Sequence, residues 1–242
     1  MWGFFTRKAA KTTNLFKTDL HSHLLPGIDD GVQSFEQAAQ IIQQFVELGF
    51  TKAITTPHIM SDTYRNTPEI IQSKLDELRL YLKSRSIIFS VEAAAEYYFD
   101  EVTSAMAVQG KPFLTFGEKY LLFETNTFSD PLLLNDFIFQ LKVKGYQPVM
   151  AHPERYKYLQ NNLDRVQDLI DRGVLMQVNS LSLSGFYSRP VQKSAIELVK
   201  NKMVHFLGSD CHSPRQADLL KDSLRSKHFQ KALELPLLNY SL

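Results

Sequence analysis

Short apolar runs alternate with longer amphipathic stretches along the chain from residue 15 onward. The short runs have the length and composition of buried strands, whereas the longer stretches repeat their apolar positions at helical spacing. Strands are predicted at residues 15–20, 52–57, 87–94, 120–124, 148–151, 174–178 and 203–207. Helices are predicted between them at residues 34–49, 67–82, 102–108, 130–145, 163–173 and 189–199, with further helices after residue 207.

Capping residues support several of these helices. Ser34 stands at an expected N-cap, and Gln37 follows it as in a capping box. Thr67 followed by Pro68 is a second start signal, because proline fits the first helical turn. Glycines close three of the predicted helices, namely Gly49, Gly145 and Gly173.

Seven strand–helix units in regular alternation predict a parallel sheet with helices packed outside it. The chain contains neither the glycine fingerprint of dinucleotide-binding sheets nor a glycine-rich phosphate loop. We therefore predict an α/β fold, a TIM-like (β/α)7 barrel, and keep an open doubly wound sheet as the alternative. At 242 residues the chain fits a single domain, residues 1–242, with an N-terminal arm at residues 1–14.

Composition narrows the classes of function. A net charge of +1 gives no basic signal for nucleic acid, and no apolar run reaches the length of a transmembrane helix. The one cysteine, Cys211, excludes an internal disulfide framework, and we expect a cytoplasmic protein. The arm begins with Met1–Lys8, aromatic before basic, which is the reverse of a secretory signal. We expect it to pack on the barrel or to fray, with contact to a membrane surface or a partner as the alternative.

Metal-competent side chains follow six of the seven predicted strands. In a barrel the carboxyl ends of the strands share one rim, where active sites are built, so these side chains are expected to converge. Imidazole together with carboxylate suits zinc, manganese or iron rather than a structural thiolate site. The strand-end residues are His21, His23, His58, Glu96, Glu124, His152, Asp210 and His212.

The end of the first strand carries the densest signal. His21 and His23 are two residues apart, which on extended backbone directs both rings to one side. The pair Asp29 and Asp30 follows in a glycine-flanked turn, and Asp30 is the stronger candidate ligand. Two further histidines are expected to lie outside the site, His205 and His228.

Other hydrolase chemistries fit the sequence less well. Arg215 follows Cys211 by four residues, too few for the phosphate loop of a cysteine-based tyrosine phosphatase, so Cys211 is interpreted as a buried spacer. No Gly-x-Ser-x-Gly elbow marks a serine hydrolase. No predicted strand ends in the lysine typical of an amidohydrolase-like barrel.

Four segments resemble the metal motifs of the polymerase and histidinol phosphatase (PHP) superfamily: Asp19–His23, Thr56–His58, Ala151–Arg155 and Gly208–His212. The longer segment His21–Gly31 is similar to that of bacterial capsule and exopolysaccharide tyrosine phosphatases of the CpsB/YwqE type. The resemblance runs from about Phe16 to about Leu220 and implies a distorted seven-stranded barrel with three metal ions. The implied ligands are His21, His23, Asp30, His58, Glu96, Glu124, His152, Asp210 and His212, and the implied phosphate-binding arginines are Arg155 and, less directly, Arg215.

The resemblance implies a metal-dependent protein-tyrosine phosphatase. Up to three divalent ions, with Mn2+ expected and Fe or Zn as alternatives, would generate a hydroxide that displaces the phosphotyrosine oxygen directly. The implied substrate is a phosphotyrosine protein, a bacterial tyrosine autokinase of capsule or exopolysaccharide synthesis. The alternatives are a histidinol-phosphate phosphatase or another PHP phosphomonoesterase, and a catalytically silent kinase-binding barrel. Two aromatic segments, residues 97–99 and 185–187, either wall the aryl ring or form ordinary lid packing.

Overall fold

The computed structural model describes residues 15–242, so the predicted N-terminal arm lies outside the described residues. The described strands form two sheets, and every strand pair in them is parallel. The first sheet contains, in order, β1 (Thr18–Leu20), β2 (Lys52–Thr55) and β4 (Ser90–Ala93). The second contains β3 (His58–Ile59), β5 (Glu96–Tyr98), β6 (Tyr120–Glu124), β7 (Gln147–Ala151), β8 (Leu175–Asn179) and β9 (Phe206–Gly208).

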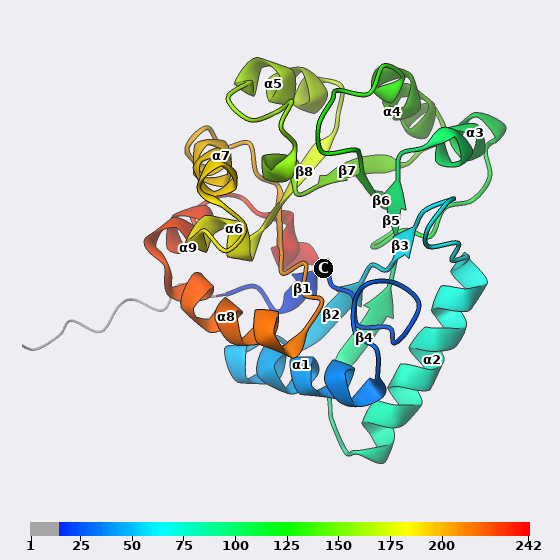
Figure 1. The fold of residues 1–242 in the computed structure, drawn as a ribbon, viewed down its shortest axis with the longest axis vertical. Coiled ribbons are helices and arrows are strands. Elements are labelled where there is room, and N and C mark those ends of the chain that lie inside the picture. The colour runs from blue at the N-terminus through cyan, green and yellow to red at the C-terminus, as the bar shows by residue number, and fades with distance from the viewer. Residues whose placement is uncertain (1–14) are drawn as a thin grey trace, which may run out of the picture.

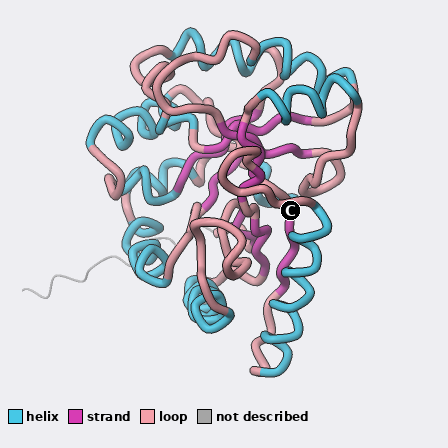
Figure 2. The backbone as a smooth tube through the Cα atoms, turned by 45° about the vertical axis from the view of Figure 1, so that its right-hand side comes forward, coloured by secondary structure: helices cyan, strands magenta, loops and turns pink. Residues whose placement is uncertain are grey.

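Helices surround the strands on the outside, as Figures 1 and 2 show. Longer helices follow most strands: α1 (Phe35–Leu48), α2 (Pro68–Ser84), α3 (Glu101–Gln109), α4 (Leu134–Val143), α5 (Leu163–Asp171) and α7 (Arg189–Lys200). The remaining ones are α6 (Ser180–Ser184), α8 (Pro214–Arg225), α9 (Lys227–Ala232) and two 3-10 turns, η1 (Pro153–Arg155) and η2 (Leu238–Ser241). No helix within residues 15–242 is both long and apolar enough to cross a membrane.

The buried core has two layers. A large cluster fills the space between strands and helices, with side chains such as Phe45 and Leu78 fully buried. A smaller cluster lies inside the ring of strands and joins side chains from both sheets: Leu20, Ile54, Ala94, Phe116, Leu122, Val149, Ala151 and Phe206. Leu238 and Leu242, at the C-terminus, pack against this inner cluster. The two sheets therefore share one interior.

The predicted α/β fold with parallel strands is confirmed, but the described strands do not close into one seven-stranded sheet. Two predicted strands are each observed shortened and followed by an additional strand after an interruption: 52–57 corresponds to β2, with β3 beginning at His58, and 87–94 corresponds to β4, with β5 beginning at Glu96. Pro57 lies at the first interruption, where it has no N–H to donate to the ladder. The strand order rises along the chain in both sheets, whereas a doubly wound sheet reverses it. The open doubly wound alternative is therefore not the fold observed.

Most predicted helix starts are confirmed, and the predicted N-cap residues make the expected hydrogen bonds. The Ser34 hydroxyl accepts the N–H of Gln37, and the Gln37 side chain accepts the N–H of Gln33 at 2.8 Å. The prediction for α4 is wrong at its start, because the helix begins at Leu134 rather than Asp130. The Asp130 carboxylate instead pairs with the guanidinium of Arg165, at 2.7 and 3.1 Å.

The first and last strands meet where the chain enters the site. The Asp19 carboxylate accepts the Ser209 N–H and hydroxyl, both at 2.9 Å, and the Asp210 N–H donates to the His21 carbonyl at 2.7 Å. Gly208 passes so close that a Cβ there would lie 2.0 Å from the Leu20 carbonyl oxygen. Only glycine fits this approach, which brings the two ends of the chain together beneath the predicted metal ligands.

Candidate metal centre

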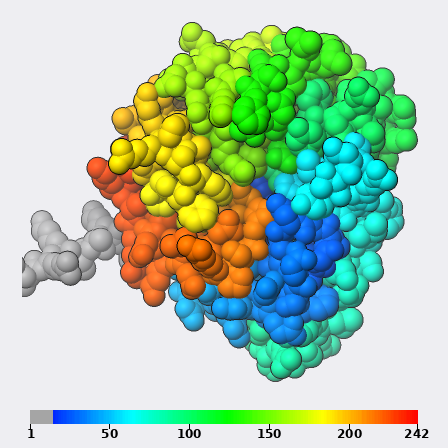
Figure 3. Space-filling model, viewed as in Figure 1, coloured from blue at the N-terminus to red at the C-terminus, as the bar shows by residue number. Residues whose placement is uncertain are grey.

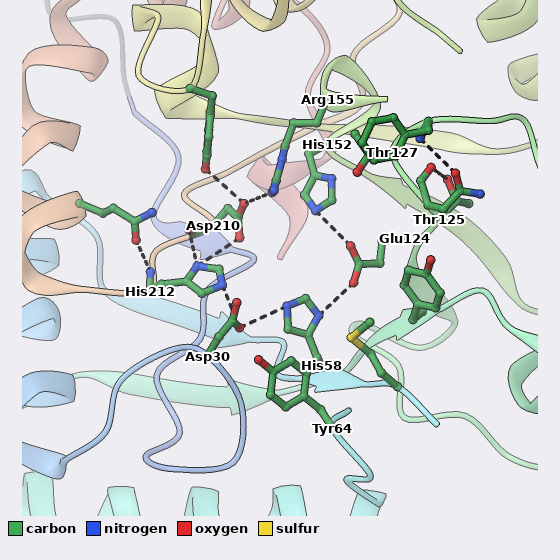
Figure 4. A pocket seen from close by; sticks show the side chains of 16 residues that line it. Asp30, His58, Tyr64, Glu124, Thr125, Thr127, His152, Arg155, Asp210 and His212 are labelled. Carbon is green, nitrogen blue, oxygen red and sulfur yellow. Dashed lines mark hydrogen bonds and ion pairs between the residues drawn. The ribbon is translucent and has the colours of Figure 1, made fainter. Parts of the chain in front are cut away.

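The structure brings all nine predicted metal ligands together at the carboxyl ends of the strands. His21, His23 and Glu96 are fully buried at the bottom of the cluster. The other six line a cavity of about 720 Å³ above them, into which their side chains point (Figure 4): Asp30, His58, Glu124, His152, Asp210 and His212. Segments from both ends of the chain, blue and orange in Figure 3, meet the yellow and green segments on one face of the molecule.

The ligand atoms of these residues fall into four overlapping groups among the described residues, and within each group the atoms lie within 4.8 Å of one another. Glu96 belongs to two groups, one with His21 and His23 and the other with His58 and Glu124. Its Oε2 lies 3.1 Å from His21 Nε2, 3.2 Å from His58 Nδ1 and 3.5 Å from His23 Nε2. One carboxylate thus stands between several imidazoles, as a ligand shared by neighbouring ions would.

The other two groups lie on either side of this carboxylate. One joins His21, His152 and Asp210. The other joins His23, Asp30, His58 and His212, and within it Asp30 Oδ1 lies 3.4 Å from Nε2 of both His58 and His212. Asp29 is not in any group, which agrees with the preference for Asp30.

Three of the cluster residues have left-handed backbone conformations, namely His21 (φ 84°), His152 (φ 34°) and Asp210 (φ 51°). Each directly follows a strand or lies two residues beyond one, so the turn of the backbone redirects the side chain over the strand end. Such conformations cost of order 1 kcal/mol each and collect at functional sites. The expectation that extended backbone alone aligns His21 and His23 is therefore wrong for His21.

The charges of the cluster are strongly coupled. Burial alone would raise the pKa of Glu96, but the charges of His21 and His58 outweigh it and hold that pKa well below its usual value. Burial would lower the pKa of His21, but the Glu96 and Asp210 carboxylates raise it to about 9. Burial would also lower the pKa of His58, but nearby carboxylates, chiefly Glu96, raise it to about 12. The carboxylates thus create a negative potential that holds cations, either protons or metal ions.

Buried atoms without a hydrogen bond test whether this donor set fits divalent metal. His23 Nε2, His58 Nδ1 and Glu96 Oε1 are buried and make no hydrogen bond to any described group. They have charge contacts only: the two nitrogens lie 3.5 and 3.2 Å from Glu96 Oε2, and Glu96 Oε1 lies 2.9 Å from His152 Nε2. Their residues all belong to the metal groups, where a bound ion would satisfy these atoms. The mixture of imidazole and carboxylate fits zinc, manganese or iron.

Residues that the sequence did not predict hydrogen-bond to the candidate ligands and so fix their orientation. Gln177 Oε1 accepts Nδ1–H of His21 at 2.7 Å, which leaves His21 Nε2 free to face the cluster. Gln177 Nε2 donates to Asn179 Oδ1 at 3.0 Å, and Asn179 Nδ2 donates to Asp210 Oδ2 at 2.6 Å. Asp29 Oδ2 likewise lies 2.7 Å from His23 Nδ1. Strand β8, which supplies no predicted ligand, therefore supplies this orienting pair.

Replacing Gln177 by leucine is expected to weaken metal binding about 10- to 100-fold, because His21 loses the acceptor that fixes its ring and tautomer. The measurement is metal retained per chain after dialysis against graded free Mn2+. Gln147→Leu, on the neighbouring β7 and outside the metal groups, is the matched control. Equal retention by both variants would remove Gln177 from the ligand-orienting network.

Arg155 lies where the resemblance implies a phosphate-binding arginine. Its Nη1 donates to Asp210 Oδ2 at 3.0 Å, and its guanidinium lies 5.1 Å from the centre of the Tyr187 ring. The Tyr187 hydroxyl is itself 3.2 Å from Asp210 Oδ2. The structure does not bring Arg215 into this arrangement, because its side chain is exposed on α8 and outside the described lining of the cavity.

Aromatic side chains form part of the cavity wall. Tyr98 and Tyr187, from the two segments considered in the sequence, line it, whereas Tyr97 is fully buried in the core. Tyr64 was not anticipated, yet it lines the cavity and its ring stacks on His58 with centroids 5.6 Å apart. The Asn66 side chain donates to the His58 carbonyl at 2.8 Å, and this bond folds the segment that carries Tyr64 back over the site. No local pattern in the sequence predicts this contact.

The remaining candidates lie outside the metal groups, as expected. Nδ1 of His205 accepts the Met176 N–H at 3.1 Å, and His228 is on α9. Cys211 is fully buried, and burial raises the pKa of its thiol. A raised pKa favours the protonated thiol, which disfavours Cys211 as a nucleophile.

Comparison with known proteins places the chain among capsular polysaccharide synthesis proteins. A family model described as capsular polysaccharide synthesis, CpsB/CapC, matches residues 17–228. The tyrosine-protein phosphatase YwqE of Bacillus subtilis is 29% identical over 217 residues, which cover 89% of this chain and 82% of that protein. The tyrosine-protein phosphatase CpsB of Streptococcus pneumoniae is 26% identical over 201 residues, 81% of this chain and 82% of that protein.

Two solved structures are similar in fold. A chain from the crystal structures of YwqE from Bacillus subtilis and CpsB from Streptococcus pneumoniae, described as unique metal-dependent tyrosine phosphatases, matches with a TM-score of 0.77 and 25% identity over 90% of each chain. Histidinol phosphate phosphatase from Lactococcus lactis, solved with zinc, L-histidinol and phosphate, matches with a TM-score of 0.57 and 11% identity over 90% of this chain and 94% of that one. At 11% identity the second likeness concerns the fold alone.

Proposed function

The chain belongs to the CpsB/CapC family of capsular polysaccharide synthesis proteins, and from this premise we propose that it is a metal-dependent protein-tyrosine phosphatase. The observation that carries the proposal is the cluster of nine histidine and carboxylate ligands beneath a cavity that Arg155 also lines. The relatives YwqE and CpsB are tyrosine-protein phosphatases. Neither a cysteine mechanism nor a silent barrel accounts for so many converging ligands.

We propose that the cluster holds up to three divalent ions, with Mn2+ as the expected metal and Fe or Zn as alternatives. The four overlapping groups offer the donors, and Glu96, His21, His23 and His58 are each shared between groups. Ions held there supply an activated water at neutral pH and stabilise charge on the phosphoryl oxygens. In this proposal the nine histidines and carboxylates of the cluster are the metal ligands.

We also propose that the two sheets are parts of one distorted seven-stranded barrel. Residues 1–242 then form a single domain.

The chain's own residues bind and orient the phosphate ester. The Arg155 guanidinium can hold two phosphoryl oxygens through its planar fork and neutralise charge that develops on them. Asp210 and Tyr187 keep that guanidinium directed into the cavity. A phenolic leaving group has a pKa of about 10, so it needs less protonation than the alkoxide of a serine would. This chemistry favours aryl phosphates.

The physiological substrate we propose is a phosphotyrosine protein, specifically a bacterial tyrosine autokinase that controls polysaccharide polymerisation and export. The family's description as capsular polysaccharide synthesis supports this assignment. A cytoplasmic site of action is part of the proposal, because Cys211 is a free thiol and such a kinase would present its phosphotyrosines there.

The decisive experiment measures phosphate release from a phosphotyrosine peptide and from histidinol phosphate side by side. Each reaction is run with added Mn2+ and again after thorough chelation. Metal-dependent release from the peptide alone is the expected result. Release from histidinol phosphate alone would move the protein to the other phosphomonoesterase class, and activity that survives chelation would overturn the metal mechanism.

Cys211→Ser is expected to keep phosphatase activity within about twofold of wild type, because the thiol is buried in the core, its pKa is raised by that burial, and its Sγ donates to the Ser213 carbonyl at 3.4 Å. Steady-state hydrolysis of the phosphotyrosine peptide is the measurement, with the melting temperature as a check on folding. Complete loss of activity in a normally folded Cys211→Ser protein would restore a thiol mechanism.

A further inference from the structure

A second hollow lies beside the catalytic cavity and is lined mainly by apolar side chains. It has a volume of about 600 Å³ and lies between α3 and the segment that precedes α4, elements that are adjacent in Figure 1. We call it the apolar groove, and its apolar walls are Phe99, Ala105, Val108, Pro131, Leu132 and Leu133. Asp100, whose carboxylate caps α3, and Glu101 are also among its lining residues.

The exposure of these side chains is unusual. Leu132 is 98% exposed, Val108 60% and Leu133 59%. Isolated apolar residues on a surface need no explanation, but a contiguous set around a concave site marks a place where a ligand or partner binds. Among the described residues, Leu132 is left almost fully uncovered, and Val108 and Leu133 more than half uncovered.

Two segments of the chain contribute lining residues to both the catalytic cavity and the apolar groove. Tyr98 lines the cavity, and the next residue, Phe99, lines the groove. Residues 124–128 line the cavity, and residues 131–133 of the same loop line the groove. The loop is therefore a common wall of the two hollows.

The common wall is held in place by polar contacts. Asn126 Oδ1 accepts the N–H groups of Phe128 at 3.0 Å and of Ser129 at 2.9 Å. Asp130 pairs with both Nε and Nη2 of Arg165. These contacts hold the wall in a defined shape, and a preformed site binds its ligand without the cost of ordering itself.

We propose that the apolar groove binds an apolar side chain of the substrate polypeptide, a few residues from its phosphotyrosine. This inference rests on the proposed phosphatase function and adds a sequence preference to it. Because the two hollows share the common wall, side chains near the phosphotyrosine in the sequence are the ones expected to reach the groove. The negative charges of Asp100 and Glu101, which are among its lining residues, disfavour an acidic residue at the same position.

A second copy of this chain fits the groove less well. A stable interface needs about 20–30 residues on each side. The groove has ten lining residues. One or two substrate side chains match this size, and the groove shares the common wall with the catalytic cavity.

The test uses phosphotyrosine peptides that are otherwise serine-rich, with leucine, glutamate or serine placed in turn at each position within about four residues of the phosphotyrosine. We expect leucine at one position to lower KM about 10-fold with kcat unchanged, since a remote contact adds uniform binding. With glutamate at that position, KM should be higher than that of the peptide with serine there. p-Nitrophenyl phosphate, which has no flanking chain, serves as the small substrate.

Leu132→Ser is expected to abolish the leucine preference while hydrolysis of p-nitrophenyl phosphate and the metal content stay at wild-type values. Leu80→Ser on α2 and Ile88→Ser are matched controls, since these apolar side chains are 68% and 96% exposed but far from the groove in the chain and outside its lining. Both controls should keep the preference.

Several outcomes would overturn the inference. Wild-type protein that hydrolyses all peptides equally, or Leu132→Ser protein that keeps the preference, would remove the groove from substrate binding. A wild-type oligomer that Leu132→Ser dissociates, with peptide KM unchanged, would assign the groove to self-association instead. Absence of hydrolysis of p-nitrophenyl phosphate and of every peptide would overturn the proposed phosphatase function itself, a result distinct from equal hydrolysis of all peptides.

Discussion

Glu96→Gln is expected to lower phosphotyrosine hydrolysis by at least about 100-fold and to lower the metal content at the same time. The carboxylate is fully buried, it faces His21, His23 and His58 through one oxygen, and its other oxygen lies 2.9 Å from His152 Nε2. Glutamine keeps the shape but removes the negative charge that holds cations in the cluster. Activity and bound metal should therefore fall together.

The measurements are kcat with saturating Mn2+ and metal per chain by elemental analysis. Glu92→Gln on β4 is the matched control, because this strand glutamate pairs with Lys52 outside the metal groups. Added Mn2+ should raise the melting temperature of the wild type and of Glu92→Gln, but raise that of Glu96→Gln less, since a ligand stabilises only the folded state that binds it. A Glu96→Gln protein with full metal content and full activity would exclude Glu96 as a ligand.

Arg155→Ala is expected to lower kcat/KM about 100- to 1000-fold without loss of metal, because the role proposed for the guanidinium is to bind the phosphoryl group and not the ions. Arg155→Lys should recover only a small part of this loss, since a point charge cannot reproduce the bidentate fork or the stacking on Tyr187. The measurement is kcat/KM on a phosphotyrosine peptide together with the metal content of each variant.

Arg215→Ala separates the two arginines that the family resemblance implies. The exposed position of Arg215 on α8 leads us to expect a much smaller loss than at Arg155. Equal losses at the two positions would mean that α8 moves its arginine into the cavity when substrate binds. Loss of bound metal in Arg155→Ala would instead show that this residue acts through Asp210 and not on the phosphate.

The sequence was most informative where chemistry follows directly from strand ends. Histidines and carboxylates at 21, 23, 58, 96, 124, 152, 210 and 212 could be recognised because parallel strands bring their carboxyl ends to one edge. The parallel α/β architecture followed from regular alternation of apolar runs. Both inferences depend on local patterns that a single chain displays without its neighbours.

Contacts between residues far apart in the sequence could not be predicted from such local patterns. Gln177 and Asn179 read as ordinary polar residues in a strand until His21 and Asp210 are placed beside them. The left-handed backbone at His21 lies where Gly208, far away in the sequence, passes close to Leu20 and His21. The interruption after β2 depends on the lost donor of Pro57, whose effect on the sheet requires knowledge of its partner strand.

The hydrogen bond between Asp19 and Ser209 joins residues 190 positions apart. The neighbouring candidate ligands follow the first strand, as His21 and His23, and the last strand, as Asp210 and His212. A ribosome adds about 5–20 residues per second, so roughly 10–40 s separate the emergence of these two ends. During that interval the growing chain has His21 and His23 but lacks Asp210 and His212. Two of the four groups need no residue beyond Glu124, whereas the other two need Asp210 or His212. A chain interrupted before its last strand would therefore be released with only half of these groups complete.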